Sequence, residues 1–418
     1  MIIFFIALVA LALIGLPLFT VLGAGSLFYA YQEGLDSALL VIELNRLTAS
    51  PNLTAIPLFT FAGVVLAAGG APQRLVRLFN ALFGWMPGGF AAVAIVSCAF
   101  FTSFSGASGV TILALGGLLY PMLRQVHYPE RFSLGLLTTS GSLGLLFPPS
   151  LAILLYGIVS GVNIDELFVA GVVPGLLLML MLGLYALYTG MRFDIPRHAY
   201  SHSELFHALK HAFGDVMLPV LIIIGIFGGF VTVTEAAACT ALYVLLLECA
   251  IYKKISIRAQ LPGLLADASV LVGSILIILG IAIGLTNLMV DAEVPTRLLD
   301  WVENRVSSPL QFLLLLNLFL LVVGAMMDIF SATMVVVPLL LPLAARYGID
   351  PVHLGIIFLA NLEIGYSTPP VGINLFIASQ RFNKPILTLF RATFPFLLLM
   401  LIWLALVTYV PILSTWWK

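Results

Sequence analysis

The chain has 418 residues, of which 61% are hydrophobic and 9% are charged, and its net charge is −1. Soluble globular domains carry about 25% charged residues, so this chain is too poor in charge to keep its surface in water. A net charge near zero also argues against a nucleic-acid or polyanion partner. We therefore expect an all-α polytopic membrane protein whose solvent is mostly lipid.

Uncharged stretches divide the chain into membrane segments. No charge occurs before residue 33 or within 78–123, 132–164 and 392–417. About 20 apolar residues cross a bilayer core as a helix, so stretch 78–123 must fold back as two spans or as a hairpin. We expect segments at about 2–30, 53–70, 87–121, 133–160, 167–191, 216–252, 268–290, 308–345, 353–380 and 390–414, several of them interrupted.

The sidedness of the chain follows from its basic residues. The first segment has no Lys or Arg before Arg46, whereas a secretory signal begins with a positive region. We expect a retained span with its N-terminus away from the cytoplasm. Basic residues gather at 124–131, 192–215 and 253–258, which predicts that these stretches are cytoplasmic. Residues 199–213 are expected to form an amphipathic helix along the membrane surface.

Catalytic motifs are missing from the sequence. It has no Gly-Lys-Ser/Thr phosphate loop, no His-Glu-x-x-His and no Gly-x-Ser-x-Gly. Cys98, Cys239 and Cys249 lie in apolar runs and are expected to be packed core thiols. We expect no enzymatic activity and no cofactor.

The two halves of the chain share a motif at a fixed spacing. Gly-x-x-x-Pro-Pro occurs at 144–149 and again at 365–370, and each copy follows a proline that closes an apolar run, Pro121 or Pro342. All four pairs of matching positions have the same difference in residue number (342 − 121, 365 − 144, 369 − 148 and 370 − 149), which we call the repeat offset. This coincidence predicts a structural repeat.

Each Pro-Pro pair predicts a broken membrane helix. Neither proline has an N–H, and the residue before each proline is displaced from the helical region. We expect breaks near Phe147 and Thr368. The freed carbonyls need a cation, water or a polar neighbour, since lipid offers none. Broken helices at matched positions in two halves indicate a transporter site.

A second interruption lies upstream of each break. The first, 101–111, is rich in Ser, Thr and Gly within an uncharged run, and the second is 324–333. At the repeat offset, Ser103 corresponds to Gly324. We expect both interruptions to be tips of helical hairpins that enter the membrane and turn back.

These four segments supply the hard oxygens that a sodium ion needs, from carbonyls and hydroxyls. Close helix packing through Ser and Gly is the alternative interpretation. The N-termini of half-helices favour an anionic substrate group, especially a carboxylate. Ser105, Ser150 and Asn374 would lie near that centre, although Asn374 equally fits a role in bridging helices.

Three carboxylates lie in apolar surroundings. Asp328 has two interpretations, a direct role in transport or a helix cap, because a membrane carboxylate needs a partner or a wet cavity. Glu235 is expected in the first turn of a helix capped by Thr232 or Thr234. Glu363 precedes the second break and fits either a structural role or a proton site.

The motifs resemble those of a known transporter family. They are Phe-Phe-Thr-Ser-Phe-Ser-Gly-Ala-Ser (100–108), Gly-Ser-Leu-Gly-Leu-Leu-Phe-Pro-Pro-Ser (141–150), Thr-Glu-Ala-Ala-Ala (234–238) and Ile-Gly-Tyr-Ser-Thr-Pro-Pro-Val-Gly-Ile-Asn-Leu-Phe (364–376). Over nearly its whole length the chain resembles the large, DctM-like membrane subunit of tripartite ATP-independent periplasmic (TRAP) transporters.

The resemblance implies a fold and a mechanism. The fold would consist of two inverted repeats with re-entrant hairpins and broken helices, as in the ion transporter superfamily. The expected scaffold covers 1–80 and 166–300, with a cytoplasmic amphipathic arm near 192–215. The expected transport domain covers 81–165 and 301–385, and 386–418 forms a C-terminal helix. The transport domain would move as an elevator in the bacterial inner membrane, driven by a sodium gradient.

The resemblance also implies partners and a substrate class. A periplasmic substrate-binding protein (P type) would deliver an organic acid such as a C4-dicarboxylate, sialic acid or another sugar acid. A small four-helix membrane subunit (Q type), expected as a separate polypeptide, would brace the scaffold. A stand-alone sodium- or proton-coupled transporter or antiporter is the alternative, and a membrane-embedded enzyme or channel is a third.

Site residues follow from the resemblance position by position. One sodium site would use Ser103, Ser108, Gly144, Phe147 and Pro148, largely through backbone carbonyls. The other would use Gly324, Gly365, Thr368 and Val371. The substrate would meet Ser105, Ser150, Asp328 and Asn374. The second hairpin has Met326-Met327-Asp328 where the first has Ser105-Gly106-Ala107, so the symmetry is looser on that side.

Overall fold

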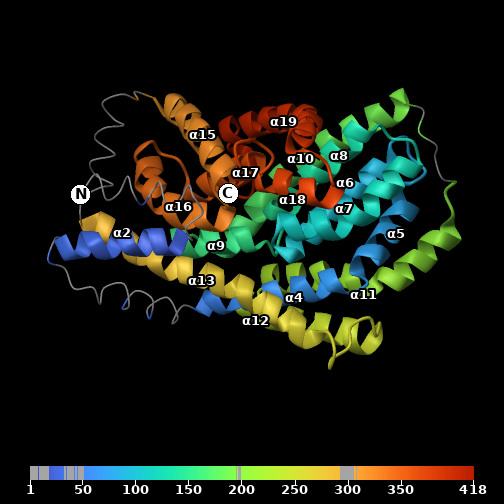
Figure 1. The fold of residues 1–418 in the computed structure, drawn as a ribbon, viewed down its shortest axis with the longest axis horizontal. Coiled ribbons are helices and arrows are strands. Elements are labelled where there is room, and N and C mark those ends of the chain that lie inside the picture. The colour runs from blue at the N-terminus through green and yellow to red at the C-terminus, as the bar shows by residue number, and fades with distance from the viewer. Residues whose placement is uncertain are drawn as a thin grey trace.

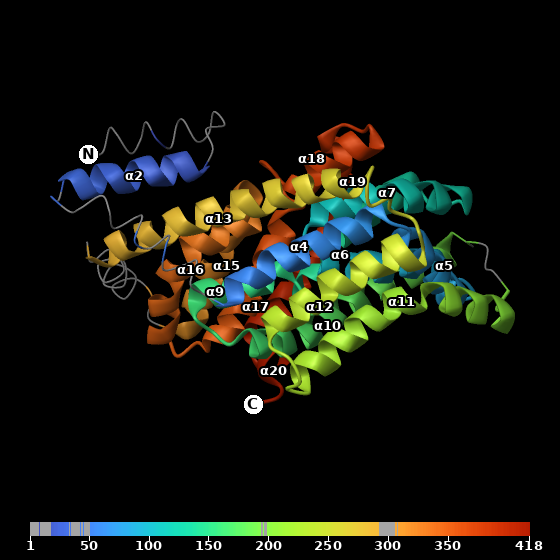
Figure 2. The same cartoon turned by 90° about the horizontal axis from the view of Figure 1, so that it is seen from below.

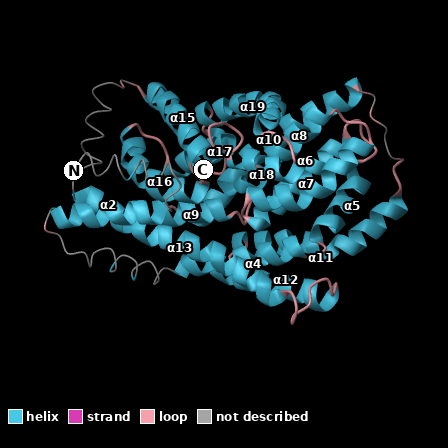
Figure 3. Cartoon of the chain, in the orientation of Figure 1, coloured by secondary structure: helices cyan, strands magenta, loops and turns pink. Residues whose placement is uncertain are grey.

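The computed structural model describes residues 8, 18–32, 34, 42, 45, 51–193, 195, 199–291, 306 and 308–418. Figure 3 shows helices joined by loops, with no strand in this described part. Seven of these helices are long and apolar enough to cross a membrane, or up to nine if each of two bent pairs forms one span. The predicted all-α polytopic membrane fold is confirmed.

The described helices of the first half run to residue 192. They are α2 (Leu18–Gln32), the short turn η1 (Pro51–Thr54), α4 (Ala55–Ala68), α5 (Ala71–Phe83), α6 (Gly89–Ser105), α7 (Ser108–Gln125), α8 (Glu130–Ser140), the 3-10 turn η2 (Leu143–Leu146), α9 (Leu151–Ser160) and α10 (Ile164–Arg192).

The second half begins at the polar stretch that follows α10. Its helices are α11 (His202–Phe227), α12 (Val233–Leu245) with the π-helical turn η3 (Leu246–Ile251), α13 (Leu261–Asp291), α15 (Pro309–Met326), α16 (Ile329–Arg346), α17 (Pro351–Gly365), α18 (Ile373–Phe382), α19 (Ile386–Tyr409) and α20 (Ile412–Thr415).

The helices are arranged in two groups. In Figure 1, α2, α13, α4, α12 and α11 lie along one side of the molecule, and α8, α10, α15, α17 and α19 lie on the opposite side. Figure 2 shows the first group from below, with α13, α4, α12 and α11 side by side. Contacts agree with the pictures, because α4 packs on α12 and α13 whereas α19 packs on α8, α10 and α17.

Both predicted hairpins turn within two residues. α6 ends at Ser105 and α7 begins at Ser108, and Gly106 between them has a φ of 65°, which suits glycine because it lacks a Cβ. α15 ends at Met326 and α16 begins at Ile329. The expected interruptions at 101–111 and 324–333 therefore lie at helix–helix turns.

Both predicted breaks are present. In the first half, α8 is followed by η2, which ends at Leu146, and α9 begins at Leu151 after the Pro-Pro pair. α17 ends at Gly365, and α18 begins at Ile373. The Pro148–Pro149 and Pro369–Pro370 peptide bonds are both cis.

Helix boundaries recur at the spacing seen in the sequence. The ends of α6 and α15 (Ser105, Met326), the starts of α7 and α16 (Ser108, Ile329) and the starts of α8 and α17 (Glu130, Pro351) are each separated by the repeat offset. The matching of whole elements, and not only of motifs, supports the predicted repeat.

The two broken helices run antiparallel. At one end, Lys384, just after α18, forms a 2.6 Å ion pair with Glu130 at the start of α8. At the other end, Tyr156 in α9 donates a 2.9 Å hydrogen bond to the Pro351 carbonyl at the start of α17. Each broken helix therefore begins where its counterpart finishes, as an inverted arrangement requires.

Two expected segments have different boundaries in the structure. The expected surface helix at 199–213 is the first half of α11, which continues to Phe227. The expected segment 216–252 is divided by a turn between α11 and α12, where Thr232 and Glu235 form a capping box. This cap confirms the role expected for Glu235.

α10 and α19 both pack against the hairpins and broken helices. α10 contacts α6, α9, η2 and α17, and α19 contacts α8, α17 and α18. Residues 166–192, expected in the scaffold, form most of α10. α10 is apolar on all its faces, so hydrophobic periodicity did not indicate which helices would pack against it.

The cysteine prediction is correct for one residue and wrong for another. Cys98 is buried in α6, as expected. Cys239 is exposed on α12. α12 lies beside α4, α11 and α13 in Figure 2, and an apolar side chain on the free face of a membrane helix can face lipid rather than protein.

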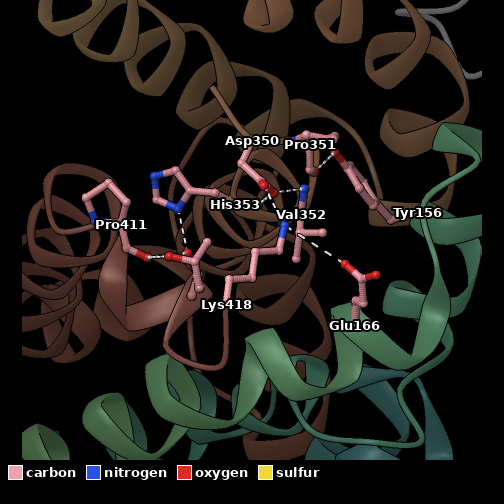
Figure 4. A network of polar contacts seen from close by, with 10 residues as sticks. Tyr156, Glu166, Asp350, Pro351, Val352, His353, Pro411 and Lys418 are labelled. Atoms are coloured by element: carbon pink, nitrogen blue, oxygen red, sulfur yellow. Dashed lines mark hydrogen bonds and ion pairs between the residues drawn. The ribbon is translucent and has the colours of Figure 1, made fainter. Parts of the chain in front are cut away.

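A polar network joins the C-terminal segment to the start of α17 (Figure 4). Asp350 caps α17 by accepting hydrogen bonds from the N–H groups of Val352 and His353, at 2.8 and 3.3 Å. The Lys418 ammonium group pairs with Asp350 and lies 3.9 Å from Glu166. Burial alone would raise the pKa of Asp350, but these hydrogen bonds bring it below its usual value.

Candidate functional site

The first hairpin and the first break touch backbone to backbone. A Cβ atom placed on Gly144 would lie 2.4 Å from the Ser103 nitrogen and 2.3 Å from the Ala99 carbonyl oxygen. Real Cβ contacts are longer, so only glycine allows this approach. Ser103 and Gly144, predicted for one sodium site, are therefore brought together by α6 and η2.

The second hairpin and the second break make the matching contact. A Cβ atom on Gly365 would lie 2.3 Å from the Gly324 carbonyl carbon. The N–H groups of Val371 and Gly372 both donate to the Ala325 carbonyl, at 3.1 Å. Gly324 and Gly365 correspond to Ser103 and Gly144 at the repeat offset, so the same close approach occurs twice.

The carbonyl oxygens at the breaks have polar neighbours. The Gly144 carbonyl accepts a hydrogen bond from the Phe147 N–H at 3.1 Å. The Gly365 carbonyl accepts from the N–H of Thr368 at 3.0 Å and from its hydroxyl at 2.9 Å. The breaks thus satisfy these oxygens through tight turns, and each carbonyl has two lone pairs in total.

Four helix N-termini begin at these tips and breaks. α7 begins at Ser108, α9 at Leu151, α16 at Ile329 and α18 at Ile373, and α7 packs on α18 as α9 packs on α16. Helix N-termini carry partial positive charge and free N–H groups. Ser150, just before α9, is buried, and its hydroxyl has no hydrogen-bond partner among the described residues.

The candidate substrate residues have different neighbours. Asn374 in α18 accepts a 2.7 Å hydrogen bond from Ser108 and lies 3.4 Å from the Thr138 carbonyl, so it bridges the halves. The Ser105 hydroxyl is 3.4 Å from both the Ala107 carbonyl and the Thr111 hydroxyl.

Asp328 caps a helix at the second hairpin tip. Its carboxylate accepts 3.0 Å hydrogen bonds from the N–H groups of Phe330 and Ser331, and another from the Ser331 hydroxyl. Of the two interpretations of this residue, the geometry favours the cap.

Thr102 also belongs to this region, although it is not among the site residues predicted from the sequence. Its hydroxyl oxygen lies 2.7 Å from the Gly141 carbonyl and 2.7 Å from the Thr111 hydroxyl. It therefore fastens the first hairpin to the first broken helix. The density of hydroxyls in 101–111 was the only signal, and it did not indicate which hydroxyl reaches another helix.

Glu363 lies at the contact between the two broken helices. Its carboxyl group is fully buried and faces Ser142, its counterpart at the repeat offset. The Ser142 hydroxyl donates to the Thr139 carbonyl at 3.1 Å, and neither Glu363 oxygen has a clear hydrogen-bond partner among the described residues.

Comparisons with known proteins agree with this architecture. Residues 2–413 match the family described as the tripartite ATP-independent periplasmic transporter, DctM component. A C4-dicarboxylate TRAP transporter large permease protein from Rhodobacter capsulatus is 35% identical, covering 97% of this chain and 96% of that protein. The isethionate TRAP transporter permease protein DctMQ of Oleidesulfovibrio alaskensis is 34% identical over 94% of this chain but only 61% of its own length.

A solved structure shares the fold. The YdaH transporter of Alcanivorax borkumensis superposes with a TM-score of 0.62 over 99% of both chains, at 15% identity. The family match and the two relatives described above each cover nearly the whole chain. The chain therefore belongs to the DctM family, the large permease components of TRAP transporters.

Proposed function

We propose that this large permease couples the uptake of an organic acid to the entry of sodium ions. One observation carries the proposal. The backbone of Ser103 contacts that of Gly144 where the first hairpin tip packs on the first broken helix. Gly324 and Gly365 make the same backbone-to-backbone contact in the second half. Such contacts gather main-chain and hydroxyl oxygens at two equivalent places, which suits two small hard cations.

The sodium sites of this proposal follow the two contacts. Each uses carbonyl or hydroxyl oxygens from one tip and one break: Ser103, Ser108, Gly144, Phe147 and Pro148 in the first, and Gly324, Gly365, Thr368 and Val371 in the second. The Gly144 carbonyl accepts one hydrogen bond and keeps a second lone pair for the ion, whereas at Gly365 the ion would take the place of the Thr368 hydroxyl donor. Sodium would in this way fasten each hairpin to its broken helix.

An anionic substrate fits the electrostatics between the two sites. Helix N-termini favour a carboxylate, and Ser105, Ser150 and Asn374 offer polar groups from the first hairpin and both breaks. Relatives named for C4-dicarboxylate and for 2,3-diketo-L-gulonate support an organic acid. A relative named for ectoine makes substrate identity a matter for direct measurement.

We assign α6–α10 and α15–α19 to the moving transport domain. These helices pack on one another, and α2, α4, α11, α12 and α13 form the other group. This division places 166–192 and 386–409 with the hairpins. An elevator motion would slide the first group against the second, carrying both sodium sites together.

Two partners complete the proposed system. A periplasmic substrate-binding protein would deliver the acid, and a small four-helix membrane subunit would support the scaffold. The relative named DctMQ is longer than this chain, and its name indicates that a permease can carry both components. We propose that this chain works with a separate small subunit.

Uptake by the reconstituted chain tests the proposal. Proteoliposomes containing the chain and its small subunit would be mixed with the binding protein and radiolabelled candidate acids, with either sodium or choline outside. Accumulation that requires sodium and the binding protein is expected. Equal uptake in choline would refute sodium coupling. Uptake without any binding protein would instead identify a stand-alone transporter.

A further inference from the structure

An apolar pocket lies beside the second break, on the side of the molecule away from the α4–α13 group. Its volume is about 350 Å³, and its walls come from α15, the end of α17, the break and α19. Figure 1 shows α15 and α19 on this side, away from α4 and α13. Apart from Thr368, none of its wall residues is among the sodium or substrate residues proposed above.

The pocket offers almost nothing to a polar ligand. Its walls are hydrocarbon side chains apart from Thr368. The Thr368 hydroxyl uses its proton in the hydrogen bond to the Gly365 carbonyl, so it has no donor left for a ligand. A ligand held here would have to be apolar.

The pocket opens at a level where lipid tails are present. Its α19 residues run from Phe390, in the second turn of this 24-residue membrane helix, to Leu401, past its midpoint. Wall residues Val322, Leu398 and Leu401 keep 59%, 48% and 41% of their surface exposed. Exposed leucines and valines at the centre of a span indicate contact with hydrocarbon rather than water.

The equivalent place in the first half is filled by protein. Phe147 stands where the second half has Thr368, and its ring packs so closely on α10 that a Cβ atom on Gly175 would lie 2.7 Å from it. α10 packs along α6, whereas its counterpart α19 makes far less contact with α15. The pocket thus lies where the second half has a threonine in place of the ring and where α19 makes little contact with α15.

We propose that one acyl chain of a membrane phospholipid occupies this pocket and replaces, in the second half, the ring that Phe147 supplies in the first. An empty apolar space forfeits dispersion contacts with its walls. The bilayer supplies acyl chains at the mouth of the pocket. The tail then covers Pro369 and Pro370, which are exposed in the protein alone. The proposal requires only that the chain spans a membrane, and does not depend on sodium coupling.

Photolabelling tests the proposal directly. The chain with its small subunit would be reconstituted in phosphatidylcholine that carries a diazirine in mid-chain, irradiated and mapped by peptide mass spectrometry. We expect adducts on the Thr368–Val371 segment. The variants Leu398→Trp and Leu401→Trp, which narrow the pocket from α19, should reduce these adducts severalfold. The control Ile402→Trp, on the same helix but outside the pocket walls, should not.

Each alternative outcome overturns the proposal. Unchanged labelling of this segment in both pocket variants would show that the adducts come from bulk lipid. Adducts that appear with the chain alone but disappear with the small subunit present would identify a protein helix as the occupant. Using two pocket variants, each checked for an unaltered melting temperature, separates a filled pocket from a misfolded protein.

Discussion

Ser108 donates a 2.7 Å hydrogen bond to the side chain of Asn374, a residue 266 positions further along the chain. Ser108 begins the helix after the first hairpin tip, and Asn374 lies in the first turn after the second break. The bond therefore joins the two halves at the candidate site.

Replacing Asn374 by Ala should impair both stability and transport. It leaves the buried Ser108 hydroxyl without its partner, which costs about 1–3 kcal/mol. We expect a lower melting temperature in detergent and a strong loss of uptake. The control Ser379→Ala removes a hydrogen bond to Lys384 at the far end of the same helix and should lower stability only. Full uptake by Asn374→Ala would show that the bond is irrelevant to transport.

Adding a single methyl group at either break should abolish uptake. Gly144→Ala and Gly365→Ala each place a Cβ atom 2.3 Å from the nearest backbone atom of a hairpin. The hairpin must move away, and the oxygens of that site separate. The measurement is sodium-dependent uptake, corrected for the amount of protein in the membrane.

Gly183→Ala is the matched control for those variants. Gly183 lies within α10, and nothing approaches a Cβ atom there within 4 Å. Alanine should raise helix stability by about 0.5–1 kcal/mol and leave uptake intact. Normal uptake by both break variants would contradict the placement of the sites.

Asp328 offers a test that separates a cap from a charge. Asn caps helices about as well as Asp, whereas Ala costs about 1 kcal/mol. We expect Asp328→Asn to retain uptake and Asp328→Ala to lose stability. If Asp328→Asn folds normally but fails to transport, the carboxylate itself takes part in the transport cycle.

Arg74 lies in the first turn of α5, just after the 72° bend between α4 and α5, and joins α5 to α11 and η3. Its guanidinium group, only 12% exposed, pairs with Asp215 at 2.6 Å and with Glu248, and these two carboxylates are almost fully buried. Removing one member of a buried pair typically costs about 3–5 kcal/mol because the remaining charge is uncompensated. Arg74→Ala should therefore lower the melting temperature by many degrees.

An exposed pair on the same helix provides the comparison. Arg77 lies 2.8 Å from Glu204, and both side chains are about half exposed. Pairs of this kind contribute about 0–1 kcal/mol. Arg77→Ala should hardly change the melting temperature. Similar shifts for Arg74→Ala and Arg77→Ala would show that burial does not decide the strength of these contacts.

Asp350 should anchor the C-terminal segment in a pH-dependent way. Its pKa is lowered in the folded protein, so its contribution is fully present above the unfolded value of about 3.9 and is lost as the pH falls through the folded value. Asp350→Asn keeps the cap but removes the ion pair with Lys418 at every pH. Amide hydrogen exchange in α20 should therefore be faster in this variant than in the wild type at neutral pH. Glu166→Gln, whose partner distance is 3.9 Å, should change it much less.

The breaks were predictable because their cause is local. A proline lacks an N–H and displaces the residue before it, wherever the chain goes next. The expected breaks at Phe147 and Thr368 lie directly after Leu146, where η2 ends, and three residues after Gly365, where α17 ends. The hairpin turns and the helix cap at Glu235 could be predicted from short stretches of sequence for the same reason.

Contacts between distant segments were not predictable in this way. The Arg74 cluster joins residues up to 174 positions apart, and Thr102 reaches a carbonyl on another helix. The exposure of Cys239 and the packing of α10 depend on which apolar face meets protein and which meets lipid. In a membrane chain both faces are apolar, so hydrophobic periodicity does not distinguish them.

The sequence by itself determined that the chain lies in a membrane, that it is helical, and where its helices break, because lipid solvation and proline chemistry act on each segment separately. The tertiary structure decided which oxygens meet at the tips and breaks, that Asp328 caps a helix, and that a pocket lies beside α19 where the second half has a threonine in place of Phe147. Those features depend on how segments from opposite halves of the sequence pack together, and that packing is a property of the whole chain.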